Sequence, residues 1–259
     1  MAVPHAVLAS LAVALGVITV TFAVARVRGR YDTIDSAWGA GFAVIAVAEF
    51  VVEPRGFGGA LMLTVLTVVW GVRLSVHIHR RNVAGGEDRR YREMFARGRR
   101  RPVLRMFVRV YLTQALVMWF VALPVVVGQQ QPDSFGPLAV AGVMVWCCGF
   151  AFEVIGDRQL RRFKADPASS GAVLDTGLWR YTRHPNYFGD ACVWWGLYLI
   201  AAQQLPGAAT VLSPLLMTWL LARGSGKPIT ERHLAATRPG YRAYIERTSG
   251  FFPLPPKKT

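Results

Sequence analysis

The sequence predicts an all-α integral membrane protein with seven transmembrane helices, its N-terminus outside the cell and its C-terminus in the cytoplasm. Hydrophobic residues make up 53% of the 259 positions and charged residues only 17%, although the net charge is +15. The apolar residues come in blocks of about twenty, the length that crosses roughly 30 Å of hydrocarbon. Basic residues gather in every second segment between these blocks. A soluble nucleic-acid binder, a disordered chain and a disulfide scaffold are all excluded by this composition.

The apolar blocks, taken in chain order, give the predicted helices. The first is longer than a signal-peptide core and has no basic residue before it, so we interpret it as a retained span. Short breaks rich in glutamine, proline and glycine separate later blocks. The predicted spans are 3–25, 34–52, 59–78, 103–127, 137–156, 187–203 and 207–222, followed by a tail over 223–259. No linker divides them, so we expect a single membrane domain over residues 1–259.

The basic residues support this division. All but two of the 30 Lys and Arg residues lie in segments 26–33, 79–109 and 157–186 or in the tail. These segments alternate with nearly uncharged ones, and the positive-inside rule then places them in the cytoplasm. The charge is thus explained mainly by topology and partly by contact with anionic membrane lipids, with no nucleic-acid partner. The bias toward Ala, Arg and Val favours a bacterial plasma membrane.

Two glutamates of the second span are candidates for acid catalysis. Glu49 and Glu53 are four residues apart and share one helix face, with Glu49 about one turn deeper in the membrane. Ionisable groups inside spans are costly, and a carboxyl in an apolar site can carry a proton at neutral pH. The alternative is a structural hydrogen bond to a neighbouring helix.

The third span carries a polar stripe along one face. Trp70, Arg73, His77 and Arg80 fall at positions i, i+3, i+7 and i+10. Because Arg73 cannot face lipid cheaply, the stripe should face the bundle interior. His77 could donate a proton there, although a histidine near the end of a span is often an interfacial residue.

The end of the fifth span is a candidate ligand site. Glu153, Asp157 and Arg161 recur at four-residue spacing, and Lys164 follows one turn later. This pattern fits an ion-pair ladder. It also fits a site in which the acids bind ribose hydroxyls or an amide and the bases hold phosphates.

The sixth span opens with a second candidate site. Arg183 and His184 precede Pro185, which suits the first turn of a helix, and Asn186 and Asp190 share a face. The free N–H groups of a helix start and the two basic residues would form an anion site. A capped helix explains Pro185 and Asn186 but not an acid inside the membrane.

The tail is expected to form two short amphipathic helices around a turn, on the cytoplasmic face. Arg223, Lys227 and Glu231 are four residues apart, and segment 238–244 follows. A surface helix held by lipid headgroups is the alternative. The sequence contains no zinc-binding spacing, and we predict no metal site.

Segment 177–190, GLWRYTRHPNYFGD, resembles the C-terminal signature of the steroid 5-alpha-reductase-like membrane superfamily, and in particular its bacterial DUF1295 branch. Segments 35–39, 87–91, 227–234 and 248–253 add to the likeness, which spans nearly the whole chain. The resemblance implies a seven-helix reductase that binds NADPH from the cytoplasmic side. Such an enzyme passes hydride to a polarised C=C, as in an enone, of a lipophilic substrate.

In the steroid reductases a Glu of the second helix and a Tyr of the third polarise the substrate carbonyl. The resemblance gives the Glu role to Glu49 or Glu53 and the Tyr position to His77, judged from the arginine three residues later. This departure puts steroid specificity in doubt, and a fatty acyl lipid or a polyprenoid fits as well. The oligomeric state is not predicted.

The same resemblance implies which residues of this sequence bind the cofactor. Asp157 and Arg161 match the family's Asp and Arg, and Asn186 and Asp190 match its Asn and Glu, whereas Glu153 stands where the steroid enzymes have Asn. The arginine excess favours the 2′-phosphate of NADPH. The predicted cofactor-binding residues are Arg80, Asp88, Arg90, Tyr91, Glu153, Asp157, Arg161, Arg183, His184, Asn186, Asp190, Lys227 and Glu231.

Two other functions compete with the reductase. The Arg-His-Pro-x-Tyr element at 183–187 and the Gly-Tyr-x-x-Tyr element at 240–244 also resemble membrane methyltransferases of the isoprenylcysteine carboxyl methyltransferase type. These enzymes use S-adenosylmethionine, a cation that needs fewer basic residues than NADPH. A non-enzymatic lipid transporter is the second alternative, although the inverted repeat expected of many transporters is not visible.

Overall fold

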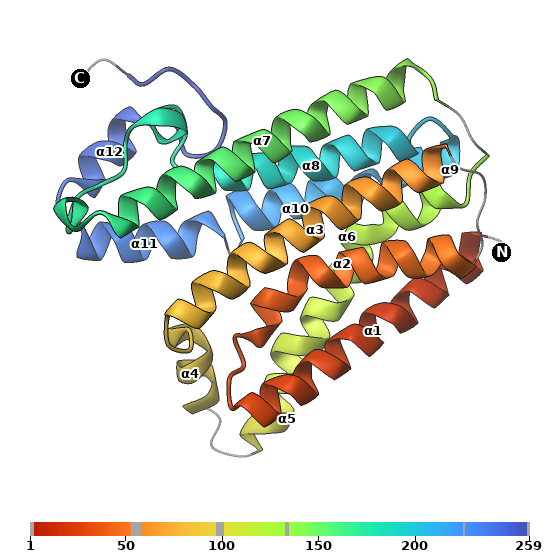
Figure 1. Ribbon diagram of the computed structural model, residues 1–259, viewed down its shortest axis with the longest axis horizontal. Coiled ribbons are helices and arrows are strands. Elements are labelled where there is room, and N and C mark those ends of the chain that lie inside the picture. Colours follow the sequence, from red (N-terminus) through yellow and green to blue (C-terminus); the bar gives the residue numbers. More distant parts are fainter. Residues whose placement is uncertain (1–2, 53–57, 97–100, 133–134, 225, 258–259) are drawn as a thin grey trace. The chain divides into compact units, whose positions relative to one another are not determined.

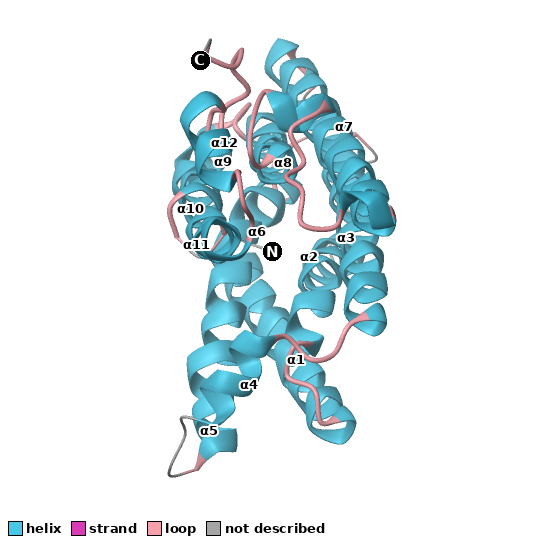
Figure 2. Ribbon diagram, turned by 90° about the vertical axis from the view of Figure 1, so that its left-hand side faces the viewer, coloured by secondary structure: helices cyan, strands magenta, loops and turns pink. Residues whose placement is uncertain are grey.

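The computed structural model describes residues 3–52, 58–96, 101–132, 135–224 and 226–257, and within these ranges every regular element is helical (Figure 1, Figure 2). The chain divides into two compact units, each described here by itself. Unit 1 comprises Met1–Ala139 and Ile200–Ser213, and unit 2 comprises Val140–Leu199 and Pro214–Thr259. The prediction of a single domain is not decided by this division.

The elements follow one another in chain order. Unit 1 is built from α1 (Val3–Arg28), α2 (Thr33–Val52), α3 (Gly59–Ala84), α4 (Arg89–Ala96), α5 (Pro102–Met106), the π-helix η1 (Phe107–Leu112), α6 (Thr113–Gln129), α9 (Leu205–Ala208) and the 3₁₀-helix η4 (Ala209–Val211). Unit 2 is built mainly from α7 (Pro137–Ala165), the 3₁₀-helices η2 (Pro167–Ser169) and η3 (Gly177–Arg180), α8 (Pro185–Ala201), α10 (Leu212–Ala222), α11 (Lys227–Thr237) and α12 (Tyr241–Arg247).

Six stretches of the described residues are helical, long and apolar enough to cross a membrane. They are Val3–Arg28, Thr33–Val52, Gly59–Val83, Pro102–Gln129, Pro137–Ala165 and Leu205–Thr237. They correspond to six of the seven predicted spans. The predicted span 187–203 falls on α8, which has 17 residues and is not among the six. Its length of about 25 Å falls short of the roughly 30 Å hydrocarbon layer.

The first helix of unit 1 turns its small residues inward. The buried positions of α1 are mostly small and recur every three or four residues; they are Ala6, Ser10, Ala14, Ile18, Thr21 and Ala25. Larger apolar residues lie on the exposed side, with Leu8 and Val20 each 65% exposed. Small residues let neighbouring helices approach closely, while an apolar outer surface is stable only against lipid. This pattern is typical of a membrane helix.

Helices α2 and α3 touch through their backbones. A Cβ placed on Gly39 would lie 2.3 Å from the carbonyl oxygen of Gly71, so neither position has room for a side chain. One turn away, the Ser75 hydroxyl accepts a hydrogen bond from the Ala40 N–H at 2.7 Å. Figure 1 shows the two helices running side by side. This contact holds Glu49 and His77, the two described catalytic candidates, on a rigid pair of helices.

Helices α7 and α8 of unit 2 meet in the same way. A Cβ on Gly189 would lie 2.4 Å from the carbonyl oxygen of Gly149 and 2.6 Å from the backbone nitrogen of Glu153. The segment before α8 is fixed to α7 as well, because the Trp179 indole donates to the carbonyl of Gly156 at 3.1 Å. The polar residues of α7 and α8 therefore face each other across a short distance.

The end of the chain folds back on the start of α8. The Thr182 hydroxyl donates to the carbonyl of Phe251 at 2.8 Å, and the Arg183 N–H donates to the carbonyl of Ser249 at 2.9 Å. The Leu254 N–H closes the contact at the carbonyl of Tyr181. The tail forms α11 and α12, as predicted, and these contacts hold its last residues against the Arg183-His184-Pro185 segment.

Candidate functional site

The predicted site residues fall in both units. Unit 1 holds those of α2 to α4, namely Glu49, His77, Arg80, Asp88, Arg90 and Tyr91. Unit 2 holds those of α7, α8 and α11 together with the segment before α8, namely Glu153, Asp157, Arg161, Arg183, His184, Asn186, Asp190, Lys227 and Glu231. Glu53 lies outside the described residues.

The first cluster in unit 2 joins α7 to α8, and we call it the α7–α8 cluster. The Asn186 side-chain amide donates to Asp157 Oδ1 at 3.1 Å. Glu153, Asp157 and Asp190 are all at least 92% buried, although acids are rarely buried to this extent. The side-chain oxygen of Asn186 is also buried, and it has no hydrogen-bond partner among the described residues. A buried acceptor without a donor costs free energy of about 1–3 kcal/mol, so this position calls for an external donor.

A second cluster in unit 2 is centred on the carboxylate of Glu231. Arg183 donates to it from Nε at 2.8 Å and from Nη2 at 3.3 Å, and His184 Nε2 lies 3.1 Å from the same carboxylate. Arg183 also donates from Nη1 to the carbonyls of Ile245 and Thr248. The guanidinium thus binds groups of this chain, and these hydrogen bonds connect the start of α8 to α11 and to the end of α12.

The imidazole of His184 is held neutral and fixed in place. Burial lowers its pKa below the ordinary value, and the neighbouring Glu231 carboxylate only partly opposes this effect. Its ring also stacks on Tyr187, with ring centroids 5.0 Å apart. A carboxylate oxygen can only accept, so Nε2 donates the hydrogen and Nδ1 is the acceptor nitrogen.

The Lys227 ammonium lies beside this second cluster. A Cβ placed on Gly250 would come within 2.8 Å of Lys227 Nζ and 3.0 Å of Arg183 Nη2. Glycine at 250 therefore leaves room for two cationic groups next to each other. Arg183 is ion-paired to Glu231, whereas Lys227 makes no ion pair with the residues that the structure describes. Lys227 is therefore the better placed of the two to bind an anion.

Three predicted residues of unit 1, Asp88, Arg90 and Tyr91, form a different kind of cluster together with Asp35, and we call these four residues the α2–α4 clamp. The Tyr91 hydroxyl donates to Asp35 Oδ1 at 2.6 Å. The Arg90 guanidinium lies 2.9 Å from Asp88 Oδ2 and 3.5 Å from Asp35 Oδ2. Each acid of the clamp therefore has its partner within the same unit.

Ionisation in the clamp follows from these contacts. Burial and the adjacent Asp35 carboxylate raise the pKa of Tyr91, so the hydroxyl keeps its proton and donates it. Burial raises the pKa of Asp88, but hydrogen bonds from the Arg90 side chain and N–H outweigh that effect and leave it lowered. Two neighbouring contacts extend the clamp, because Glu87 accepts from the Tyr31 N–H and Asp32 accepts from the Asp88 N–H.

The two described catalytic candidates differ in their surroundings. Glu49 is 2% exposed, and its Oε2 is buried and makes no hydrogen bond within the described part of the chain. His77 is half-buried on α3, in a stripe that runs from the buried Trp70 to the exposed Arg80. The inward end of the predicted stripe is thus confirmed, and its outer end faces away from the unit.

Several residues that build these clusters were not among the predicted site residues. Asp35 belongs to the clamp, Asp32 and Glu87 make the contacts that extend it, and Trp179 and Tyr187 fix the start of α8. Asp35, Glu87, Trp179 and Tyr187 all lie inside segments that carry the family resemblance. That resemblance marked the segments, but the spacing alone did not indicate which of their residues pair.

The comparisons with known proteins identify the family of this chain. The family model described as "Protein of unknown function (DUF1295)" matches residues 21–248. The chain belongs to the DUF1295 family. The predicted membership is confirmed, and the matched range includes the clamp and both clusters of unit 2.

A second comparison finds an uncharacterized protein of the fission yeast Schizosaccharomyces pombe. It is 24% identical to this DUF1295 chain, and the match covers 74% of this chain and 63% of the yeast protein. The chain thus spans less than two thirds of that relative's length. No solved structure matches the chain.

Proposed function

We propose that this DUF1295 protein is a membrane-embedded reductase that uses NADPH to reduce a polarised C=C, such as that of an enone, in a lipophilic substrate. The observation that carries the proposal is the α7–α8 cluster. Asp157 and Asn186 are joined by a hydrogen bond, and the Asn186 side-chain oxygen is buried with no donor among the described residues. A dinucleotide offers the missing donors, because its ribose hydroxyls and carboxamide donate hydrogen bonds.

The residues present fit such a cofactor in part. Glu153, Asp157, Asn186 and Asp190 supply acceptors for hydroxyl and amide groups, as carboxylates and amides do in dinucleotide sites. For the phosphates, Lys227 and Arg161 are the better candidates, because Arg183 is committed to Glu231 and Arg90 to Asp88 and Asp35. His184 and Glu231 would then orient the start of α8 rather than bind the phosphates.

When bound, NADPH supplies the hydride. The chain's own part is to polarise the substrate, and we assign this role to Glu49. A proton on its buried Oε2 would be donated as a hydrogen bond to the substrate carbonyl oxygen, where negative charge develops during the reaction. His77 is assigned to support the same oxygen from α3, and Glu53 remains an alternative acid.

The membrane topology belongs to the same proposal. Six long apolar helices support an integral membrane protein, and we propose that α8 is a seventh, shorter crossing helix. With the N-terminus outside and the C-terminus inside the cell, the basic segments lie on the cytoplasmic side of a bacterial plasma membrane. The site in unit 2 would then open toward the compartment that contains NADPH.

The proposal is tested by titrating the purified protein in detergent with NADPH and, separately, with S-adenosylmethionine. We expect NADPH to bind with a Kd in the micromolar range or below, a free energy of about −8 kcal/mol or better. Binding of S-adenosylmethionine without NADPH would reject the reductase and support a methyltransferase. Binding of neither would favour the non-enzymatic lipid transporter.

A further inference from the structure

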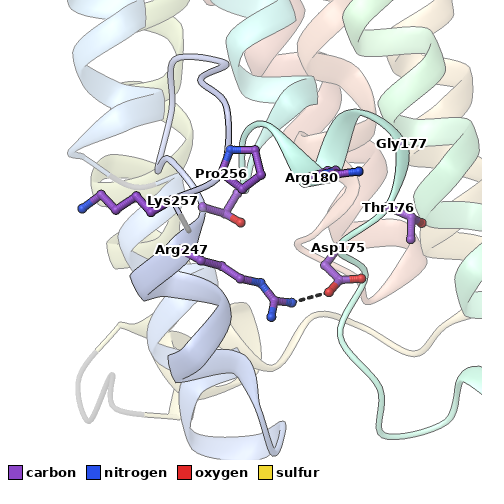
Figure 3. A pocket seen from close by; sticks show the side chains of 8 residues that line it. Asp175, Thr176, Gly177, Arg180, Arg247, Pro256 and Lys257 are labelled. Atoms are coloured by element: carbon purple, nitrogen blue, oxygen red, sulfur yellow. Dashed lines mark hydrogen bonds and ion pairs between the residues drawn. The ribbon is translucent and has the colours of Figure 1, made fainter. Parts of the chain in front are cut away.

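A polar cavity lies in unit 2, and none of its lining residues belongs to the predicted cofactor set. It has a volume of about 430 Å³, within the range of small-molecule sites. It lies between the segment before η3 and the chain end beyond α12 (Figure 3). The lining residues are Asp175, Thr176, Gly177, Arg180, Arg247, Thr248, Pro256 and Lys257.

The charge of this cavity is unbalanced. Three of its residues are cationic and one is acidic, and the acid, Asp175, is already paired with Arg247. Figure 3 shows Arg247 reaching toward Asp175, with Arg180 on the neighbouring wall and the Lys257 ammonium directed outward. Arg180 and Lys257 make no ion pair within the described part of the chain. The lining residues therefore carry an excess of two positive charges, of which that of Arg180 lies at the wall and that of Lys257 is directed away from Arg247.

Both walls of the cavity are held in place by the fold. Gly177 has φ +60° and packs so closely on α7 that a Cβ there would lie 2.3 Å from the Gln159 amide nitrogen. On the other wall, the Lys257 N–H donates to the carbonyl of Arg247 at 2.9 Å, which closes the chain end onto α12. The site is thus shaped before any ligand arrives, which lowers the entropic cost of binding.

We propose that this cavity binds a phosphate monoester group, separately from the dinucleotide site. A phosphate carries a charge of about −1.5 to −2 at pH 7, which is opposite in sign to the net charge of the lining residues. Arg247 donates to Asp175 from Nη2, and a guanidinium has five N–H groups, so others can reach a phosphate oxygen. Thr176 and Thr248 also line the cavity, and a threonine hydroxyl is a hydrogen-bond donor. The phosphate belongs either to a water-soluble compound or to a lipid headgroup.

The test uses inorganic phosphate and pyrophosphate, titrated calorimetrically onto the full chain in uncharged detergent. Arg180→Gln removes a cation without breaking an ion pair, so we expect binding to weaken about three- to tenfold. Asp175→Asn frees Arg247 and adds one positive charge, so we expect binding to tighten by a similar factor. A gain of affinity cannot result from misfolding. The matched control is Arg242→Gln, which removes an exposed charge of α12 outside the cavity and should change nothing.

The two sources of phosphate are separated in nanodiscs. In discs of phosphatidylcholine alone, binding of soluble phosphate or pyrophosphate supports a water-soluble ligand. Phosphatidic acid added to the discs supports a lipid headgroup if it raises the melting temperature of the wild type and not that of Arg180→Gln.

Three results would overturn the proposal. One is binding of no phosphate compound, soluble or lipid, to the wild type. Another is an equal loss in Arg180→Gln and Arg242→Gln, which would mean only a general effect of charge. The third is loss of NADPH binding in Arg180→Gln, because the cavity would then be part of the dinucleotide site. Failure of the reductase proposal alone would leave the phosphate titration unaffected.

Discussion

The α2–α4 clamp of unit 1 and the α7–α8 cluster of unit 2 look alike in the sequence and differ in the structure. Both contain predicted cofactor-binding residues, namely acids and a hydrogen-bonding side chain, Tyr91 in the clamp and Asn186 in the α7–α8 cluster. In the clamp, Tyr91 and Arg90 are bound to Asp35 and Asp88. In the α7–α8 cluster, the Asn186 side-chain oxygen is buried and has no donor among the described residues. The difference supports our proposal that the α7–α8 cluster binds the cofactor, whereas the contacts of the clamp stabilise unit 1.

The largest expected effect is the loss of stability on breaking a buried ion pair, compared with the loss on breaking an exposed one. Arg183 and Glu231 are 8% and 16% exposed, and Arg183→Ala would leave the Glu231 carboxylate without its main partner. Removing one member of a buried pair costs about 3–5 kcal/mol of stability. The Arg90 side chain is 47% exposed, so Arg90→Ala should cost at most about 1 kcal/mol. Thermal unfolding in detergent measures both, and equal losses would contradict the burial argument.

The next effect concerns cofactor affinity. Asp157→Ala removes the acceptor that orients the Asn186 amide, and Asn186→Ala removes the buried acceptor itself. Asp157→Ala should weaken NADPH binding about 10- to 100-fold, since hydrogen bonds to charged groups contribute about 1.5–3 kcal/mol. Asn186→Ala should weaken it about 2- to 10-fold, since a hydrogen bond between neutral groups contributes about 0.5–1.5 kcal/mol. Fluorescence titration of NADPH gives the dissociation constants. Arg158→Ala, which removes an exposed side chain of α7, is the control and should bind NADPH as the wild type does.

Tyr91→Phe tests whether the clamp contributes to stability and not to NADPH binding. It removes the hydroxyl that donates to Asp35 and leaves a buried carboxylate oxygen without that donor. We expect a loss of about 1–2 kcal/mol in the free energy of unfolding and no change in the dissociation constant of NADPH. If the variant has normal stability but binds NADPH more weakly, the clamp would have to be assigned to the ligand site.

The catalytic assignment is tested by Glu49→Gln and His77→Phe. Both should bind NADPH normally and oxidise it more slowly in the presence of an enone substrate, because they act on the substrate carbonyl and not on the cofactor. Glu49→Gln should lose about 10²- to 10⁴-fold in kcat. Unchanged turnover in both variants would remove these residues from the mechanism.

The smallest expected effect is a pH dependence from His184. Its pKa in the folded protein lies below the ordinary 6.5, so the unfolded chain binds its proton first. Its contribution to stability is therefore fully present above pH 6.5 and is lost as the pH falls below that value, by at most about 1.4 kcal/mol per pH unit. His184→Gln should flatten this part of the profile, and equal slopes for the two proteins would contradict the assignment.

Much of the fold could be predicted from the sequence because each membrane helix corresponds to a long block of apolar residues. Blocks of apolar residues identified six helices, and Pro185 marked the start of α8. The ends of α8 were predicted less exactly, because the predicted span runs over 187–203 whereas the helix runs from Pro185 to Ala201. Where an apolar run ends does not determine where the backbone hydrogen bonds end.

The candidate site was predicted less completely. Asp157 and Asn186 were expected to converge, and the structure joins them. Arg183 and Arg90 were expected to bind phosphates, but their guanidinium groups meet Glu231, Asp88 and Asp35. Spacing along one helix shows which residues share a face. It does not show whether the partner of a cation is a ligand or a carboxylate 48 residues away in the chain, as Glu231 is from Arg183.

The central claim is that NADPH binds at the α7–α8 cluster, and hydrogen exchange measured with and without NADPH tests it most directly. We predict that NADPH slows amide exchange in segments 153–161 and 184–190 and leaves segment 87–91 unchanged. Slower exchange confined to segment 87–91, or no change in any of these segments at saturating NADPH, would contradict the claim.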